Sequence, residues 1–170
     1  MSHTCILQVE DEAQDVFLLQ RAFIQAGIAH PVQVATDGQM AIDYLSGLGK
    51  FADRKRYPLP CLVLLDLKLP RRSGREVLEW MRSQPGLNRT VVIVFTSGQY
   101  VGDVSLAYEL GANSFIIKPA SFSQYVEIAR LLQGWWLRFN QFPPASELAW
   151  DLPAIAHPYL APQQPRIDPS

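Results

Sequence analysis

CLVLLDLKLP, residues 61–70, is the stretch that decides the fold of this chain. Four apolar residues, 62–65, run without a break into a single carboxylate, Asp66. An unbroken apolar run of this kind is typical of a strand that is buried on both faces of a parallel sheet. Asp66 would then lie at the carboxyl end of that strand, where open α/β sheets place their ligand sites.

Apolar runs and helical periodicity alternate five times along the chain. The other strands are predicted at 5–9, 32–35, 91–95 and 114–117. Helices are predicted at 13–27, 38–48, 75–83 and 101–110, and a last one runs from the cap Ser121 to about residue 139. This alternation predicts an α/β fold, a five-stranded doubly wound parallel sheet with helices on both faces.

The composition is that of one globular domain with an appendage. Of the 170 residues, 48% are hydrophobic and 18% are charged, which suits a folded core. A net charge of −1 gives no reason to expect binding to nucleic acid or to a membrane. There is no membrane-spanning run and no secretory signal, so we predict a cytoplasmic protein with Cys5 and Cys61 as buried, reduced thiols.

The last part of the chain differs in composition from the rest. Residues 143–170 hold seven of the 13 prolines, a density that no helix or central strand tolerates. We therefore predict a domain at 1–139 and a proline-rich C-terminal arm at 140–170, which ends in a flexible tail. The segment 143–170 has one arginine, Arg166, and no lysine, which argues against a DNA-binding output.

Aromatic residues gather at the end of the last predicted helix. Trp135 and Trp136 are adjacent and therefore point about 100° apart, so both cannot face the same core. Exposed aromatic side chains beside a proline-rich arm indicate a protein interface. We predict a homodimer through this helix and the arm, with an interface that contains Trp135, Trp136, Phe139, Phe142 and Trp150.

Chemically reactive side chains end four of the five predicted strands: Glu10 and Asp11, Asp66, Thr96, and Lys118. The carboxyl ends of parallel strands meet at one edge, so we expect these groups to lie together. Three close carboxylates repel one another unless a cation neutralises them, and hard oxygen ligands favour Mg²⁺. The lysine and the hydroxyl could hold phosphoryl oxygens, with Asp66 as a nucleophile that forms an aspartyl phosphate.

Each part of this pattern also has an ordinary structural explanation. The acidic residues 10–12 would be favoured at a helix N-terminus, and Thr96 and Ser97 are common turn residues. The coincidence of all of them at the ends of the correct strands favours the functional interpretation.

Four motifs resemble the receiver domain of two-component response regulators: VEDE at 9–12, LLDLKLP at 64–70, VFTSG at 94–98 and FIIKP at 115–119. The resemblance covers residues 4–139 and implies a flavodoxin-like sheet of order 2-1-3-4-5. It implies that Asp66 accepts a phosphoryl group. It also implies that Asp11, Asp66 and the backbone carbonyl of Lys68 bind Mg²⁺, with Glu10 acting through water.

The same resemblance gives roles to the remaining residues. Thr96 would hydrogen-bond the phosphoryl group and Lys118 would pair with it, and the Lys118–Pro119 peptide would be cis. Thr96 and Phe115 would form the conformational switch, with a phenylalanine in the position of the family's aromatic residue. Lys68 and Gly98 stand where the family tunes the lifetime of the phosphoryl group.

Three features are similar to the single-domain regulators paired with bacterial and cyanobacterial phytochromes: the segment LPRRSGREVLEWMR at 69–82, the long basic loop at 49–60 before the third predicted strand, and the aromatic end of the last helix. This similarity implies a phytochrome-type histidine kinase as partner and an output through protein–protein interaction. Such a regulator phosphorylates and dephosphorylates itself and is not classed as an enzyme.

Two other functions use related residues. One is an Mg²⁺-dependent phosphatase or phosphotransferase with an aspartyl phosphate, although such enzymes usually carry a DxD motif and this chain has Lys68 in place of the second acid. The other is a scaffold that is never phosphorylated, and the complete set of strand-end residues argues against it.

Overall fold

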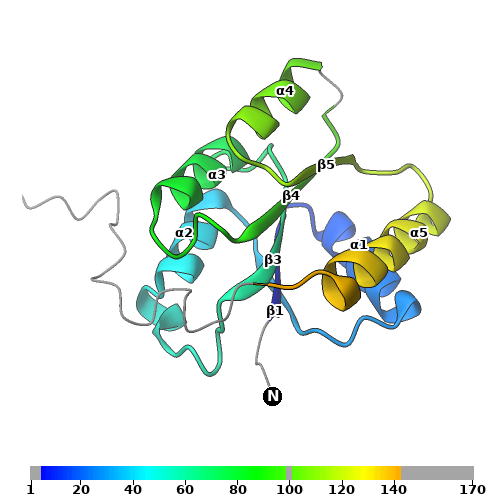
Figure 1. The fold of residues 1–170 in the computed structure, drawn as a ribbon, viewed down its shortest axis with the longest axis horizontal. Coiled ribbons are helices and arrows are strands. Elements are labelled where there is room, and N and C mark those ends of the chain that lie inside the picture. Colours follow the sequence, from blue (N-terminus) through cyan, green and yellow to red (C-terminus); the bar gives the residue numbers. More distant parts are fainter. Residues whose placement is uncertain (1–4, 99–100, 143–170) are drawn as a thin grey trace, which may run out of the picture.

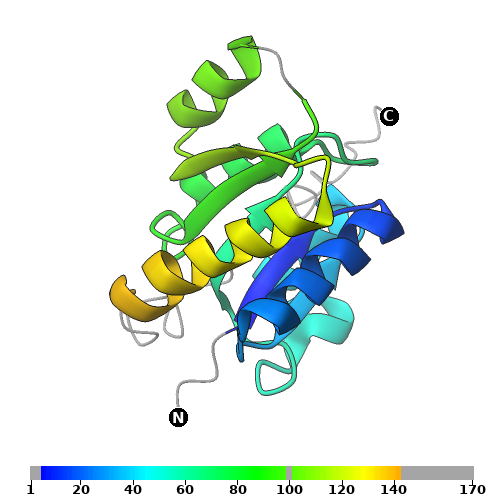
Figure 2. The ribbon, with the colours of Figure 1, turned by 90° about the vertical axis from the view of Figure 1, so that its right-hand side faces the viewer.

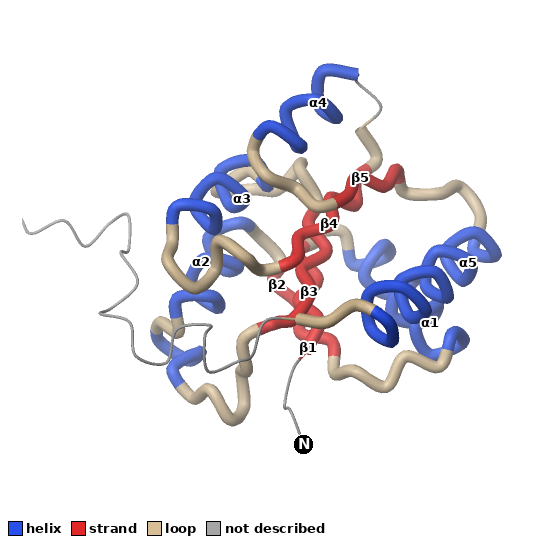
Figure 3. Tube along the Cα trace, viewed as in Figure 1, coloured by secondary structure: helices blue, strands red, loops and turns tan. Residues whose placement is uncertain are grey.

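Five parallel strands form one sheet at the centre of the molecule, in the order β2-β1-β3-β4-β5 (Figure 3). The computed structural model describes residues 5–98 and 101–142. The predicted fold class and strand order are confirmed. The strands are β1 (Cys5–Val9), β2 (Val32–Ala35), β3 (Pro60–Leu65), β4 (Val91–Thr96) and β5 (Ser114–Ile117).

Helices cover both faces of the sheet (Figure 1). One face carries α1 (Ala13–Ala26) and α5 (Phe122–Leu132), which lie side by side (Figure 2). The other face carries α2 (Gly38–Ser46), α3 (Gly74–Ser83) and α4 (Val101–Glu109). None of the helices within the described residues is both long and apolar enough to cross a lipid bilayer.

Strand β3 supplies both hydrophobic cores because its successive side chains point to opposite faces. Val63 and Leu65 pack in the core under α2, α3 and α4, whereas Leu62 and Leu64 pack in the core under α1 and α5. Every residue of β3 is buried, which explains why its sequence is apolar without alternation. Cys5 and Cys61 are buried thiols, as predicted.

The register of the sheet brings the strand ends to one edge. Val9 of β1 pairs with Leu65 of β3, and Thr96 of β4 pairs with Ile117 of β5. The backbone continues this pattern past the strands, because the N–H of Asp66 donates to the carbonyl of Val9 at 3.0 Å. The residues that follow the strands therefore lie at the carboxyl edge of the sheet.

Side chains at the helix starts fix the loops at that edge. Asp37 caps α2 by accepting a 2.7 Å hydrogen bond from the N–H of Met40. Ser73 and Glu76 form a capping box at the start of α3. Between them lies Gly74, where a Cβ would come within 2.0 Å of the carbonyl oxygen of Asp66, so only glycine lets α3 approach the end of β3.

The last helix is not a single α-helix to residue 139. The α-helix ends at Leu132 and continues as a π-helical stretch, η2 (Gln133–Phe139). The side-chain amide of Gln133 donates to the carbonyl of Gly27 at 3.0 Å and ties this junction to the end of α1. Of the predicted C-terminal arm at 140–170, residues 143–170 lie outside the described part of the chain.

Candidate functional site

Asp66 follows β3 directly and is 4% exposed. Its Oδ1 atom accepts a 2.7 Å hydrogen bond from the hydroxyl of Thr96, the last residue of β4, and a 3.0 Å bond from the N–H of Lys68. Thr96 is completely buried. Neighbouring strands therefore fix the Asp66 carboxylate in one orientation.

Lys118 follows β5 and places its ammonium among three carboxylates. Its Nζ atom lies 2.6 Å from Asp66 Oδ2, 2.5 Å from Glu10 Oε2 and 2.7 Å from Asp15 Oδ2. The side chains of Lys118, Glu10 and Asp66 are 6%, 3% and 5% exposed. One cation thus neutralises part of a buried cluster of negative charge.

Burial and pairing oppose each other in this cluster. Burial alone would lower the pKa of Lys118, but hydrogen bonds to Asp15, Asp66 and Glu10 outweigh it and raise that pKa above its usual value. Burial raises the pKa of the Glu10 carboxyl, and Lys118 offsets only part of this effect. Lys118 is therefore held as a charged ammonium at neutral pH.

The same edge offers oxygen atoms to a metal ion. Carboxylate oxygens of Glu10, Asp11 and Asp66 lie within 4.8 Å of one another. Asp11 is exposed, whereas the other two are buried. Three hard oxygen donors, one of them open to water, fit a hydrated divalent cation better than a soft metal.

Lys68 and Gly98 lie together at the rim of the site. A Cβ on Gly98 would be 3.8 Å from both Lys68 Cε and Thr96 Oγ1, and 3.2 Å from Asp103 Oδ2. Asp103 of α4 also forms an ion pair with Arg75 of α3. The aliphatic part of Lys68 therefore lies against the backbone that follows Thr96.

Two predictions from the family resemblance concern β5 and its end. Phe115 is partly buried and packs against the core under α2, α3 and α4, beside its strand partner Val94. The prediction of a cis peptide between Lys118 and Pro119 is wrong, because all peptide bonds between described residues are trans. The physical reason is that trans is favoured over cis before proline, by about 0.5–1 kcal/mol.

The structure brings together Glu10, Asp11, Asp66, Thr96 and Lys118, as the strand-end pattern predicted. It also adds Asp15, which the sequence analysis missed. Asp15 lies in the first turn of α1. Its position one helical turn after the acidic residues at the end of β1 was the signal that could have identified it.

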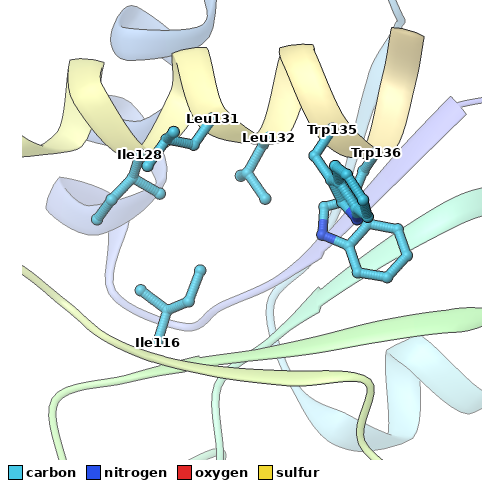
Figure 4. Close-up of a pocket in the computed structure, with 6 residues that line it drawn as sticks. All are labelled: Ile116, Ile128, Leu131, Leu132, Trp135 and Trp136. Atoms are coloured by element: carbon cyan, nitrogen blue, oxygen red, sulfur yellow. The ribbon is translucent and has the colours of Figure 1, made fainter. Parts of the chain in front are cut away.

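The aromatic end of the last helix forms a second feature, which shares no residue with the cluster around Asp66. An apolar hollow of about 240 Å³ lies between β5 and the last helix (Figure 4), lined by Ile116, Ile128, Leu131, Leu132, Trp135 and Trp136. Trp135 and Phe139 are each 66% exposed, whereas Trp136 and Phe142 pack against the core under α1 and α5. Trp150 lies outside the described residues.

Comparison with known proteins identifies relatives over most of the chain. The family model "Response regulator receiver domain" matches residues 6–130. Response regulator Rcp1 of Synechocystis sp. is 33% identical over 140 residues, which are 82% of this chain and 93% of that protein.

Solved structures of similar proteins have the same fold. The Mn²⁺-bound form of Rcp1 is 32% identical with a TM-score of 0.74, and it covers 82% of this chain and 99% of its own. The phosphorylated cyanobacterial phytochrome response regulator RcpA is 35% identical with a TM-score of 0.77, covering 84% and 99%.

Proposed function

Because the chain belongs to the response regulator receiver domain family, we propose that Asp66 accepts a phosphoryl group from a histidine kinase. Phosphorylation of an aspartate is general in this family. The observation that carries the assignment is that Asp66 accepts hydrogen bonds from both Thr96 and Lys118. These are the hydroxyl and ammonium donors that a phosphoryl group on Asp66 would need.

The transfer forms a bond between an Asp66 oxygen and phosphorus while the phosphorus–nitrogen bond of a phosphohistidine breaks. The hydroxyl of Thr96 and the ammonium of Lys118 are already within 2.7 Å of the Asp66 carboxylate, so small shifts direct them to the new phosphoryl oxygens. In this proposal Thr96 then moves toward the phosphoryl group, and Phe115 of β5 reports the change to the α4 side of the sheet.

A divalent metal is general for the family, and we propose that Mg²⁺ is the ion used here. Glu10, Asp11 and Asp66 would hold it, with the backbone carbonyl of Lys68 as a further ligand. When bound, it supplies positive charge that offsets the negative charge of a phosphoryl group. The chain's own contribution is to hold the three carboxylates close together before the ion arrives.

The test is phosphorylation with Mg²⁺ and acetyl phosphate, followed by intact-mass measurement and peptide mapping. We expect one phosphoryl group, stable in acid and labile in base, on Asp66. Asp66→Asn should lose it, whereas Asp53→Asn, in the loop that leads into β3, should keep it. Labelling of Asp66→Asn at the parent stoichiometry would show that another residue is the acceptor.

We further propose that the kinase is a phytochrome-type photoreceptor and that both proteins meet in the cytoplasm. The support is the similarity to RcpA, a cyanobacterial phytochrome response regulator. Phosphotransfer from a purified phytochrome histidine kinase should be faster than from a histidine kinase without a photoreceptor domain, and it should differ between red and far-red light. Equal rates from both kinases would contradict the pairing.

For the output, we propose a homodimer of receiver domains, residues 1–139, joined through the last helix and the extension 140–170. A second copy would cover the apolar hollow and the exposed side chains beside it, of which Trp135, Leu131 and Phe139 are the largest. An exposed apolar patch of this kind is costly to leave in water, and a second copy would remove it from water.

Mass in solution, measured by light scattering, tests the dimer. The full chain should be a dimer, and both Trp135→Ala and truncation after Phe139 should weaken it. Ile24→Ala, at an exposed apolar residue on α1, is the control and should leave the dimer unchanged. A monomeric full chain would contradict the dimer, and an unchanged truncated dimer would contradict a role for the arm.

A further inference from the structure

Among the described residues, Asp15 is the one carboxylate paired with Lys118 that lies outside the group that could hold a metal ion. Its Oδ2 atom lies 2.7 Å from Lys118 Nζ, and its side chain is 27% exposed. Glu10 and Asp66, the other two partners of Lys118, both have oxygens in the cluster that could hold a metal ion. Lys118 therefore contacts two potential metal ligands and one carboxylate outside that set.

This division matters because a metal ion and the Lys118 ammonium would share the same two carboxylates. An ion that binds Glu10 and Asp66 weakens their attraction for an ammonium that lies 2.5 and 2.6 Å from them. Asp15 gives the ammonium a partner that the ion does not need. The contact with Asp15 can thus persist while the other two weaken.

We propose that Asp15 is a positioning residue that holds Lys118 in place while Glu10 and Asp66 are taken up by the metal ion and the phosphoryl group. This inference rests on the proposed role of Asp66. It assigns Asp15 no contact with the reacting atoms. Its effect passes through the side chain of Lys118.

A simpler explanation is that Asp15 is only an acid in the first turn of α1, favoured there by the helix dipole. That role would require no particular partner, and it would be independent of Lys118. The structure instead shows a specific partner for Asp15. Its side chain, at the start of α1, accepts a hydrogen bond from Lys118 at the end of β5, 103 residues away in sequence. The two explanations differ in whether the effect of Asp15 depends on Lys118.

A double-mutant cycle separates them, with the Kd for Mg²⁺ measured by calorimetry as the first readout. Asp15→Asn should raise that Kd by about fivefold, because Lys118 then has only potential metal ligands as partners. In a Lys118→Met background the same substitution should change the Kd no more than Glu12→Gln does. Glu12 is an exposed acid next to α1 and controls for the loss of one negative charge.

The second readout is the rate of Asp66 phosphorylation by acetyl phosphate at saturating Mg²⁺. Asp15→Asn should slow it, and Asp15→Glu, which keeps the carboxylate, should recover part of the rate. The inference would be overturned if Asp15→Asn changed the Kd for Mg²⁺ equally with and without Lys118. It would also be overturned if Asp15→Asn changed the Kd or the phosphorylation rate only as much as Glu12→Gln does. If the parent chain is not phosphorylated on Asp66, the proposed function fails instead, and the cycle on Mg²⁺ binding still tests the contact.

Discussion

The hydroxyl of Thr96 and the carboxylate of Asp66 form a 2.7 Å hydrogen bond between two side chains that are almost completely buried. The bond joins the end of β4 to the end of β3. It leaves the other oxygen, Oδ2, to Lys118 at 2.6 Å. The two oxygens of Asp66 thus have different side-chain partners, a hydroxyl and an ammonium.

Replacement of Thr96 by valine keeps the shape of this residue and removes the hydroxyl. We expect Thr96→Val to lower the free energy of unfolding by about 1.5–3 kcal/mol, because a buried charged acceptor loses a donor. It should also slow phosphorylation of Asp66. Urea unfolding and acetyl phosphate kinetics measure the two effects, and Thr96→Ser, which keeps the hydroxyl, should lie closer to the parent in both. A valine variant as fast as the parent would show that the hydroxyl has no part in transfer.

Gly74 is required where the start of α3 approaches the end of β3. In Gly74→Ala the new Cβ would meet the carbonyl oxygen of Asp66 at 2.0 Å and the Cα of Leu67 at 2.8 Å, and both are backbone atoms. We expect a loss of about 1–3 kcal/mol in unfolding free energy, together with slower phosphorylation because the backbone of Asp66 must shift.

Gly102 of α4 is the matched control for this substitution. A Cβ there meets no atom of the described residues within 4 Å, so Gly102→Ala should raise the unfolding free energy by about 0.5–1 kcal/mol through helix propensity. Urea unfolding of both variants gives the comparison. Equal stability of the two alanine variants would contradict the close approach at Gly74.

Arg82 joins α3 to the loop between α4 and β5. Its Nε and Nη2 atoms donate to the carbonyl of Gly111 at 2.9 and 2.7 Å, and its Nη1 atom donates to the carbonyl of Thr90 at 2.9 Å. Arg82→Met keeps much of the apolar stem and leaves these carbonyls without their donor. We expect a loss of about 2 kcal/mol in unfolding free energy.

Arg130, an exposed arginine in the last turn of α5, is the control for Arg82. Arg130→Met should change the unfolding free energy by less than about 0.5 kcal/mol. Native-state hydrogen exchange should also show faster exchange near Gly111 in Arg82→Met alone. If the two variants were equally stable, the contacts of Arg82 would contribute nothing to the fold.

The fold and most of the site residues at the carboxyl edge of the sheet were predictable, because they depend on strands that are buried on both faces. In β3 and β4 every residue is buried, so the apolar runs marked the strands, and the next residue of each run marked the edge. The contact between Asp15 and Lys118 was not predictable in this way. It depends on how α1 packs against the sheet and on the direction of one side chain.

Smaller energy differences explain the other deviations. Cis and trans peptides before proline differ by only about 0.5–1 kcal/mol, so the residue pair Lys118–Pro119 does not decide the isomer. The π-helical stretch at Gln133–Phe139 likewise has no signature in the periodicity of its side chains. The sequence analysis did not single out Arg82, whose partners are backbone carbonyls 8 and 29 residues away in the chain.

Glu76 makes the unfolding free energy depend on pH in the acid range, and a single substitution can measure this contribution. Hydrogen bonds from the backbone N–H of Ser73 at 2.8 Å and from its hydroxyl at 2.9 Å lower the pKa of Glu76 below its ordinary value of 4.5. The folded state therefore holds this proton less tightly than the unfolded state. The stabilisation from the lowered pKa of Glu76 is fully present above the unfolded-state pKa of 4.5. It is lost as the pH falls through the lower pKa of the folded state.

Glu76→Gln keeps an acceptor for the capping box but removes the titrating carboxylate. We expect this variant to be less stable than the parent near neutral pH, and the difference should shrink as the pH falls from about 6 to about 3. Urea unfolding across this range measures it. Glu79→Gln, on the same helix but outside the capping box, should run parallel to the parent. A constant difference between Glu76→Gln and the parent at every pH would show that the ionised carboxylate of Glu76 contributes nothing to the cap.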